Sequence, residues 1–224
     1  MKAERLSPLH LWAGAVLSLA LSGCALTGKG DALEPRYFSP EGLTSSGATH
    51  AAPRVPAAEL RLGHVTAPLY LEDQLVYRGS DYQLGLYAER RWTEPPEGYL
   101  ERRLARVLFE ERGLRQLVGG PGLVLDAELT AFEEIRSAPA RARVEVHVTL
   151  HDQRVTRWEE TLSVETPLVL GPGEDHANEL VAALAEGLRS VVERIATRVL
   201  VEVVALPPTA QPGPRAAAPD HSPR

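Results

Sequence analysis

Residues 142–151 read ARVEVHVTLH, and this stretch decides the fold because it has the clearest two-residue period in the chain. Successive side chains of a β-strand point to opposite faces of the sheet, so the pattern predicts a strand with one apolar and one polar face. The apolar positions are Ala142, Val144, Val146, Val148 and Leu150, and the polar positions are Arg143, Glu145, His147, Thr149 and His151. The sequence therefore predicts a sheet with one face in the core and the other toward water.

Further strands are predicted on both sides of this stretch. Residues 123–131 alternate in the same way, with Ala131 as their last apolar position, and a third strand carries Trp158 and Leu162 on one face. Residues 151–154 are expected to connect the last two strands as a hairpin. Nearer the N-terminus, strands are expected at residues 59–66 and 82–89, and residues 74–78 form either a short strand or an extended loop.

A helix is predicted over residues 96–113, with Thr93 as its N-terminal cap and Gly113 as its end. Its apolar side chains fall on one face, namely Leu100, Leu104, Val107 and Leu108.

A longer helix is predicted after Gly171-Pro172-Gly173 interrupts the chain, with Asp175 at its start. Its apolar stripe consists of Val181, Leu184, Leu188, Val191, Ile195 and Val199. This spacing is compatible with a coiled coil, but a single helix of this length is better explained as a core helix packed lengthwise on the sheet.

The elements together predict the α/β class, as a single domain in which a mixed β-sheet has two main helices packed against it. We place this domain at residues 35–206. Residues 207–224 are dominated by Pro, Ala and charged side chains and predict a disordered tail.

The composition limits the classes of function. With 224 residues, 44% of them hydrophobic and 24% charged, the chain has the balance of one globular domain of ordinary size. A net charge of -6 argues against a nucleic-acid-binding surface, which requires a basic stripe, so no nucleic-acid partner is expected.

The N-terminus has the order of charges and apolar residues that is typical of a secretion signal. Lys2 and Arg5 precede an apolar run over residues 11–21, which is too short to span a bilayer because a spanning helix needs about 20 residues. Residues 1–23 are therefore predicted to be a signal peptide. Cys24 is the one cysteine of the chain, so no internal disulfide is expected.

Leu21-Ser22-Gly23-Cys24 resembles the lipobox of bacterial lipoproteins, although an ordinary secretion signal with a chance cysteine is the alternative. The resemblance implies that Cys24 receives the lipid and that residues 24–34 form a flexible tether, which spans about 17 Å as a coil. In the sorting scheme of such lipoproteins, Ala25 instead of Asp favours the outer membrane, facing the periplasm.

The search for catalytic chemistry predicts no enzyme, no cofactor and no metal site. His147 and His151 share a strand face but lie about 13 Å apart, too far to bind one metal. Residues 119–122 are glycine-rich but lack the Lys and Ser/Thr of a phosphate loop. Glu133 and Glu134 are neighbours in a strand, so their side chains point to opposite faces and do not form a carboxylate pair.

Residues 62–78, LGHVTAPLYLEDQLVYR, and residues 92–95, WTEP, resemble the auxiliary lipoproteins of ABC-type transport systems, the paraquat-inducible protein C family. The order and spacing of the motifs carry the resemblance, which covers residues 35–204, with Tyr37-Phe38 as the first aromatic strand. Pro96 and the loop over residues 40–57 depart from the family pattern. The family-motif residues are Pro68, Tyr70, Leu71, Arg78, Trp92, Glu94 and Pro95.

The resemblance implies a non-catalytic accessory subunit, anchored in the outer membrane, of an ABC-type lipid transport system. Its expected partners are the membrane, through the lipid anchor, a mammalian-cell-entry-type periplasmic protein, and an ABC permease and ATPase; a homo-oligomer is possible. The alternative is an envelope lipoprotein that activates a cell-wall synthase or scaffolds a Tol–Pal-type complex. Tyr70, Leu71 and Trp92 are expected either in the core or at a partner contact.

Overall fold

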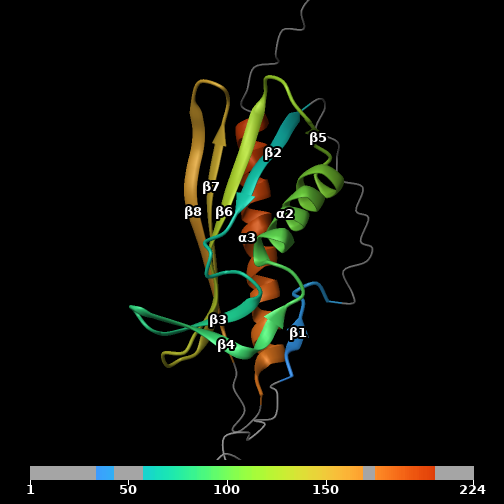
Figure 1. The fold of residues 1–224 in the computed structure, drawn as a ribbon. Coiled ribbons are helices and arrows are strands. Elements are labelled where there is room, and N and C mark those ends of the chain that lie inside the picture. Colours follow the sequence, from blue (N-terminus) through green and yellow to red (C-terminus); the bar gives the residue numbers. More distant parts are fainter. Residues whose placement is uncertain (1–33, 43–57, 169–174, 205–224) are drawn as a thin grey trace, which may run out of the picture. The chain divides into compact units, whose positions relative to one another are not determined.

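The computed structural model describes residues 34–42, 58–168 and 175–204 (Figure 1). Apart from Glu34, these residues belong to one compact unit that begins at Pro35. Several predictions lie outside the described residues. They are the signal peptide and lipobox with Cys24, most of the tether, the interruption at residues 171–173 and the tail at residues 207–224.

The fold is α/β, with two helical segments against one mixed sheet, as the sequence predicts. The strands of the described part are β1 (Arg36–Phe38), β2 (Glu59–Thr66), β3 (Gln74–Ser80), β4 (Gln83–Trp92), β5 (Arg115–Gln116), β6 (Leu123–Ile135), β7 (Arg141–His151) and β8 (Thr156–Pro167). The helices are α2 (Pro96–Ala105), which continues as the π-helix η2 (Arg106–Glu111), and α3 (Ala177–Val204).

Strand β6 organises the sheet because its two edges have different partners. One edge pairs with β7 along its whole length in the antiparallel sense. The other edge pairs with β2 over Leu123–Glu128 and with β3 over Glu133–Ile135, both in the parallel sense. The β3–β4 hairpin therefore joins the sheet only at the C-terminal end of β6, and β1 extends it by pairing with β4.

A β-bulge at Thr130 separates the two halves of β6. The register with β7 shifts between Leu129 and Ala131, so Phe132 takes the core position opposite Val144. Because a bulge inserts one residue, it reverses which residues face the core beyond it. Ala131, the last alternating apolar position in the sequence, is buried, but the bulge pairs it with Glu145 instead of an apolar residue of β7. The alternation of core-facing residues that the sequence predicts therefore ends at Leu129, and the strand continues to Ile135.

Both helices cover the same face of the sheet, which is the apolar face that the alternation in residues 142–151 predicts. Helix α3 packs on β7 and β8, while α2 packs on β2 and β6 and also contacts α3 (Figure 1). The alternate residues Ala142 to Leu150 of β7 are all buried, and the residues between them are half-buried on the opposite face. The long helix is thus a core helix.

The helix predicted over residues 96–113 differs from the prediction in two respects. Pro95, not Thr93, precedes its first residue, and the Thr93 hydroxyl lies 2.7 Å from the Tyr99 hydroxyl instead of capping the helix. The second half is a π-helix, in which Arg106 Nε lies 3.3 Å from Glu111 Oε1, five residues further on. Gly113 follows it with a φ of 71°, a conformation that favours glycine at a helix end.

The hairpin between β7 and β8 is confirmed, and Asp152 stabilises its turn. The Asp152 carboxylate accepts the backbone N–H groups of Arg154 and Val155 at 2.8 and 2.9 Å, and the Arg157 guanidinium at 2.8 Å. These donors, with the Arg154 N–H first, lower the pKa of Asp152 to about 2.

Candidate functional site

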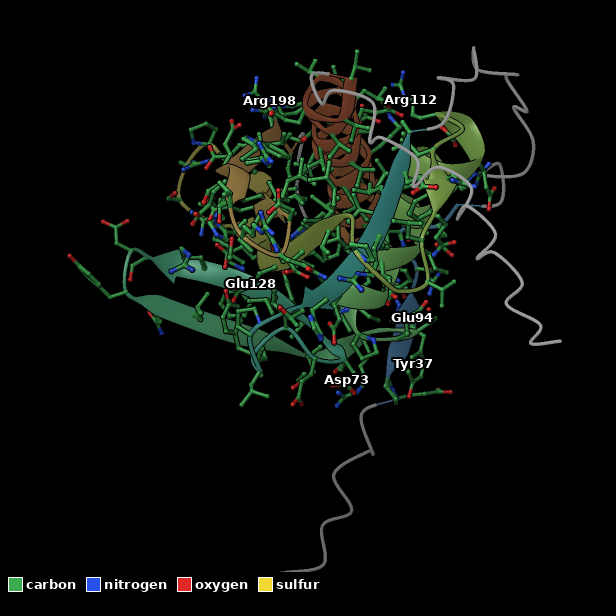
Figure 2. The ribbon with its side chains drawn as sticks, turned by 90° about the horizontal axis from the view of Figure 1, so that it is seen from above. Tyr37, Asp73, Glu94, Arg112, Glu128 and Arg198 are labelled. Carbon is green, nitrogen blue, oxygen red and sulfur yellow. The ribbon has the colours of Figure 1, made fainter. Side chains whose placement is uncertain are left out.

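The β3–β4 hairpin extends away from the rest of the sheet, as the views from two directions show (Figures 1 and 2). Tyr82, in the turn between its strands, is 99% exposed. Leu84 and Leu86 of β4 are also exposed, and they share one strand face because they are two residues apart. We call Tyr82, Leu84 and Leu86 the hairpin surface. Large apolar side chains that stay exposed together mark candidate interaction sites.

The turn before β3 holds the first family-motif residues. The Pro68 carbonyl accepts a 2.9 Å hydrogen bond from the Leu71 N–H, which directs the Leu71 side chain into the core, where it is 1% exposed. Leu69, between them, is 87% exposed. The Tyr70 hydroxyl donates to the Thr130 carbonyl at 2.6 Å, so this turn is attached to the bulge of β6.

The root of the hairpin is held on one sheet face by the fully buried carboxylate of Glu133. Arg78 Nε and Nη2 donate to the two Glu133 oxygens at 2.9 and 3.2 Å, and Arg143 Nη2 of β7 lies 2.6 Å from Oε1. The bond to Glu133 raises the pKa of Arg78. Burial, with the nearby Glu133 charge, raises the pKa of Tyr70. Glu133 thus connects three strands: β3, β6 and β7.

On the helix side of the sheet, Glu134 holds the root of the hairpin in the same way. Its carboxylate is 2% exposed and accepts the Tyr87 hydroxyl of β4, and Oε1 lies 2.9 Å from His176 Nε2 just before α3. Burial and the bond to Glu134 raise the pKa of Tyr87. The Arg136 guanidinium lies 3.4 Å from the ring centre of Tyr77. The hairpin is therefore fixed to the body through both faces of β6.

The prediction that Glu133 and Glu134 face opposite sides is confirmed, but their burial was not foreseen. The sequence identifies them only as adjacent acids within a strand. One signal in the sequence could have indicated this burial, namely that the two acids follow the aromatic residue Phe132 inside a predicted strand. Charged side chains are buried in a strand only when other residues, such as arginine, tyrosine or histidine, pair with them. Except for Arg136 and Arg143, those partners come from 42 to 55 residues away along the chain.

The second motif, residues 92–95, lies at the start of α2. Trp92 is 1% exposed and packs with its ring centre 5.0 Å from Phe132, so it belongs to the core, as does Leu71. Glu94 accepts Arg102 Nη1 at 2.6 Å, and this bond lowers the pKa of Glu94. Pro95 accepts the Gly98 N–H at 3.0 Å. These residues hold the turn from β4 into the helix.

The strand histidines face the polar side of the sheet, each beside a carboxylate. His151 Nε2 lies 2.9 Å from Asp126 Oδ2, and His147 Nε2 lies 3.4 Å from Glu159 Oε1. The bond to Asp126 raises the pKa of His151. Burial opposes ionisation of Asp126, but the His64 N–H and His151 outweigh it, and the pKa of Asp126 is lowered. Within the described ranges, no group of three His, Cys, Asp or Glu side chains is placed to hold a metal.

The profile of the family described as the ABC-type transport auxiliary lipoprotein component matches residues 42–196. No curated protein matches the chain.

Two solved structures are similar in fold. The crystal structure of protein XCC0632 from Xanthomonas campestris has a TM-score of 0.61 and 18% sequence identity, covering 75% of this chain and 96% of that one. A crystal structure of an uncharacterized protein has a TM-score of 0.57 and 19% identity, covering 74% of this chain and 99% of that one. At these identities the likeness establishes the fold alone. None of the helices in the described part is long and apolar enough to cross a membrane.

Proposed function

Because the chain belongs to the ABC-type transport auxiliary lipoprotein component family, we propose that it is the non-catalytic accessory subunit of an ABC-type lipid transport system. Its partners would be a mammalian-cell-entry-type periplasmic protein and the ABC permease and ATPase. Cys24 would carry the lipid, and Ala25 would direct the protein to the outer membrane, facing the periplasm. As a coil, the tether of residues 24–34 would have an average end-to-end distance of about 17 Å.

The observation that carries the docking role is the fixed position of the hairpin surface. Tyr82, Leu84 and Leu86 are exposed on an extension, while Glu133 and Glu134 anchor the root of that extension on both sheet faces. A preorganised apolar surface binds a partner without the cost of ordering a loop. Aromatic residues such as Tyr82 are also frequent energetic centres of protein interfaces.

A non-catalytic role agrees with the chemistry of the polar clusters. The carboxylates of Glu133 and Glu134 are buried and occupied by partners from neighbouring strands. A catalytic acid or base must reach the proton that it transfers in a bound substrate, whereas these two groups face protein side chains.

The test is in-cell crosslinking and affinity purification of the full lipidated chain, followed by mass spectrometry. We expect the wild type to recover a mammalian-cell-entry-type protein and ABC permease, and the Leu84→Ser/Leu86→Ser variant to lose at least about 90% of them, since a hot-spot loss of 2 kcal/mol reduces affinity about thirtyfold. Val118→Ser is the matched control, because Val118 is 98% exposed outside the hairpin.

Either of two outcomes would contradict the proposal. Recovery of peptidoglycan synthases or Tol–Pal components in place of the transporter would favour the alternative function. If the hairpin variant and the Val118→Ser control recovered the transporter partners equally, the hairpin surface would not be the docking element.

A further inference from the structure

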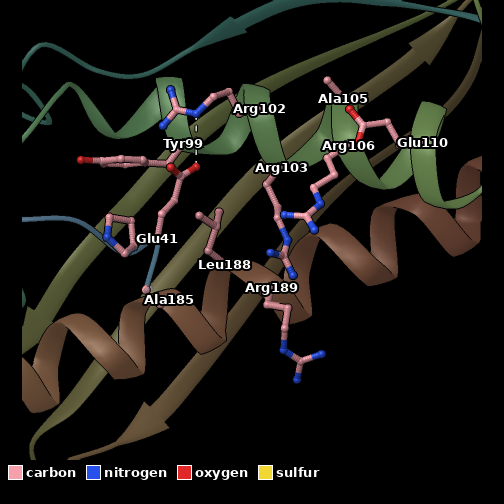
Figure 3. A pocket seen from close by; sticks show the side chains of 12 residues that line it. Glu41, Tyr99, Arg102, Arg103, Ala105, Arg106, Glu110, Ala185, Leu188 and Arg189 are labelled. Atoms are coloured by element: carbon pink, nitrogen blue, oxygen red, sulfur yellow. Dashed lines mark hydrogen bonds and ion pairs between the residues drawn. The ribbon is translucent and has the colours of Figure 1, made fainter. Parts of the chain in front are cut away.

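A groove of about 490 Å³ lies between α2, η2 and α3, next to residues 40–42 (Figure 3). Its apolar lining consists of Ala185 of α3 and of the nearly buried side chains of Leu188 of α3 and Tyr99 of α2, which are 5% and 1% exposed. Its basic groups are Arg102, Arg103, Arg106 and Arg189, which come from both helical segments. The groove thus combines an apolar lining with four guanidinium groups, and its volume is in the range of small-molecule sites.

Three of these arginines have carboxylate partners. Arg102 pairs with Glu94 and Glu41, and Arg189 pairs with Glu186 one turn away on α3. Arg106 pairs with Glu111 in the π-helix. These pairs hold the side chains in place along the groove.

Arg103 differs from the other three. Its Nε is buried and has no hydrogen-bond partner among the described residues, and no carboxylate forms an ion pair with its guanidinium within them. A buried donor without a partner is unfavourable, and an oxyanion is the group that satisfies a guanidinium best, through two parallel hydrogen bonds. Arg103 also adds, after Arg189, to lowering the pKa of Glu186, so its guanidinium lies near this carboxylate of α3.

Two carboxylates also line the groove, those of Glu41 and Glu110. Glu41 pairs with Arg102, and among the described residues neither carboxylate forms an ion pair with Arg103. An occupant that complements the groove therefore needs one negative group for Arg103 and an apolar part for Ala185 and Leu188.

We propose that the α2–α3 groove binds an anionic amphiphile, namely an acyl or alkyl chain with a carboxylate or phosphate head group. The head group lies at Arg103 and Arg189, and the chain lies along Ala185, next to the nearly buried Leu188. This site is separate from the hairpin surface, and the inference does not depend on the proposed transport function.

The test is calorimetric titration of the full chain in phosphatidylcholine nanodiscs, with empty nanodiscs as the blank. Decyl phosphate and decanoate are the amphiphilic anions, inorganic phosphate provides the anion alone, and decanol provides the chain alone. We expect one site for each amphiphilic anion, with inorganic phosphate and decanol at least about tenfold weaker. The two anions together distinguish a phosphate from a carboxylate head group.

Substitutions in the groove test whether the amphiphilic anions bind there. Arg103→Gln removes the head-group contact and is expected to weaken binding about tenfold or more. Ala185→Phe fills the groove without changing a charge and is expected to abolish binding. Arg198→Gln is the matched control, because Arg198 is an α3 arginine with its own helix partner, Glu202, outside the groove.

Several results would overturn the proposal. They are equal affinity for inorganic phosphate and decyl phosphate, equal affinity for decanol and decyl phosphate, or unchanged binding in Ala185→Phe. Circular dichroism checks the fold of each variant, and if Arg103→Gln does not fold, Arg189→Gln takes its place with the same expected loss. The purification experiment with the hairpin variant tests docking through the hairpin surface, whereas the titrations test ligand binding in the groove. Failure of one proposal is therefore distinguishable from failure of the other.

Discussion

The fully buried carboxylate of Glu133 lies between two arginines that keep 21% and 25% of their side-chain surface exposed. Removing one member of a buried ion pair leaves the other charges unpaired, which typically costs 3–5 kcal/mol. Because both arginines retain some water contact, we expect Glu133→Gln to lower the free energy of unfolding by about 3 kcal/mol. Urea denaturation followed by circular dichroism measures this change.

Glu159→Gln is the control, since Glu159 lies on the polar side of the sheet with 58% of its side chain exposed. It should change the free energy of unfolding by less than about 1 kcal/mol. If Glu133→Gln were as mild as this control, the hairpin root would not depend on the buried carboxylate.

The His151–Asp126 pair predicts a dependence of stability on pH. The pKa of His151 is raised above 6.5, so its contribution is fully present below pH 6.5 and is lost as the pH rises through the folded-state value. The pKa of Asp126 is lowered below 3.8, so its contribution is present above pH 3.8 and is lost as the pH falls through the folded-state value. The pair therefore stabilises the fold most between pH 3.8 and 6.5.

His151→Gln should lower the melting temperature more at pH 5.5 than at pH 8.5. The loss is expected to remain below about 1 kcal/mol, because both side chains are one-third exposed and solvent screens the pair. His64→Gln serves as the comparison, since the His64 side chain is 93% exposed and 3.7 Å from Asp126. Equal losses at the two pH values would rule out the charged His151.

For single residues, the sequence indicates which charged side chains matter better than it indicates their ion-pair partners. Arg78 and Glu94 were selected from motifs, and each forms an ion pair in the structure. Their partners Glu133 and Arg102 were not selected, because pairing of Arg78 with Glu133 depends on the parallel contact of β3 with β6, which no local pattern encodes. Arg102 pairs with Glu94 eight residues away, through the turn at Pro95.

Among the elements, α3 and β7 approach each other closely at Gly187. A Cβ atom at this position would lie 2.8 Å from Val144 Cγ2, so Gly187→Ala must displace the helix or the valine. Overpacking of this kind costs about 1–3 kcal/mol, whereas alanine gains about 1 kcal/mol over glycine in a helix. We expect a net loss of about 1 kcal/mol, measured as a fall in melting temperature of about 2–4 °C.

The close contact can be tested by a double-mutant cycle. Val144→Ala removes the methyl group that Gly187→Ala would meet, so the second substitution should cost less, or even stabilise, in the Val144→Ala background. Additive effects of the two substitutions would show that the alanine methyl does not meet Val144.

Element types were predictable where the periodicity was uninterrupted, as in β7 and α3. The prediction failed where one inserted residue changes the period. Thr130 reverses the inward-facing set of β6, and η2 replaces an α-helical turn by a π-helical one. Neither change has a distinct composition, because both depend on packing against neighbouring elements.

For the whole molecule, the α/β class and the one-sided cover of the sheet follow from the pattern in residues 142–151 and the two apolar helix faces. The extension of the β3–β4 hairpin does not, because residues 74–78 allowed either a strand or a loop. In the structure these residues form a strand, because Val76 pairs with Glu133 of the distant strand β6. Sequence alone therefore predicts the framework, while the candidate docking surface emerges only from the three-dimensional arrangement.

The predicted anchor gives the last test at this scale. If Cys24 carries the lipid, full-length protein made in a Gram-negative host should incorporate a palmitate label, and Cys24→Ser should incorporate none and retain residues 1–23. Buried acyl chains contribute about 0.8 kcal/mol per methylene, so two or three chains should keep the wild type in the membrane fraction through a high-salt wash. Ala25→Asp should move the labelled protein from the outer to the inner membrane fraction, with Ala25→Ser as the control that stays. Label in Cys24→Ser would contradict attachment at this residue, because the chain contains no other thiol.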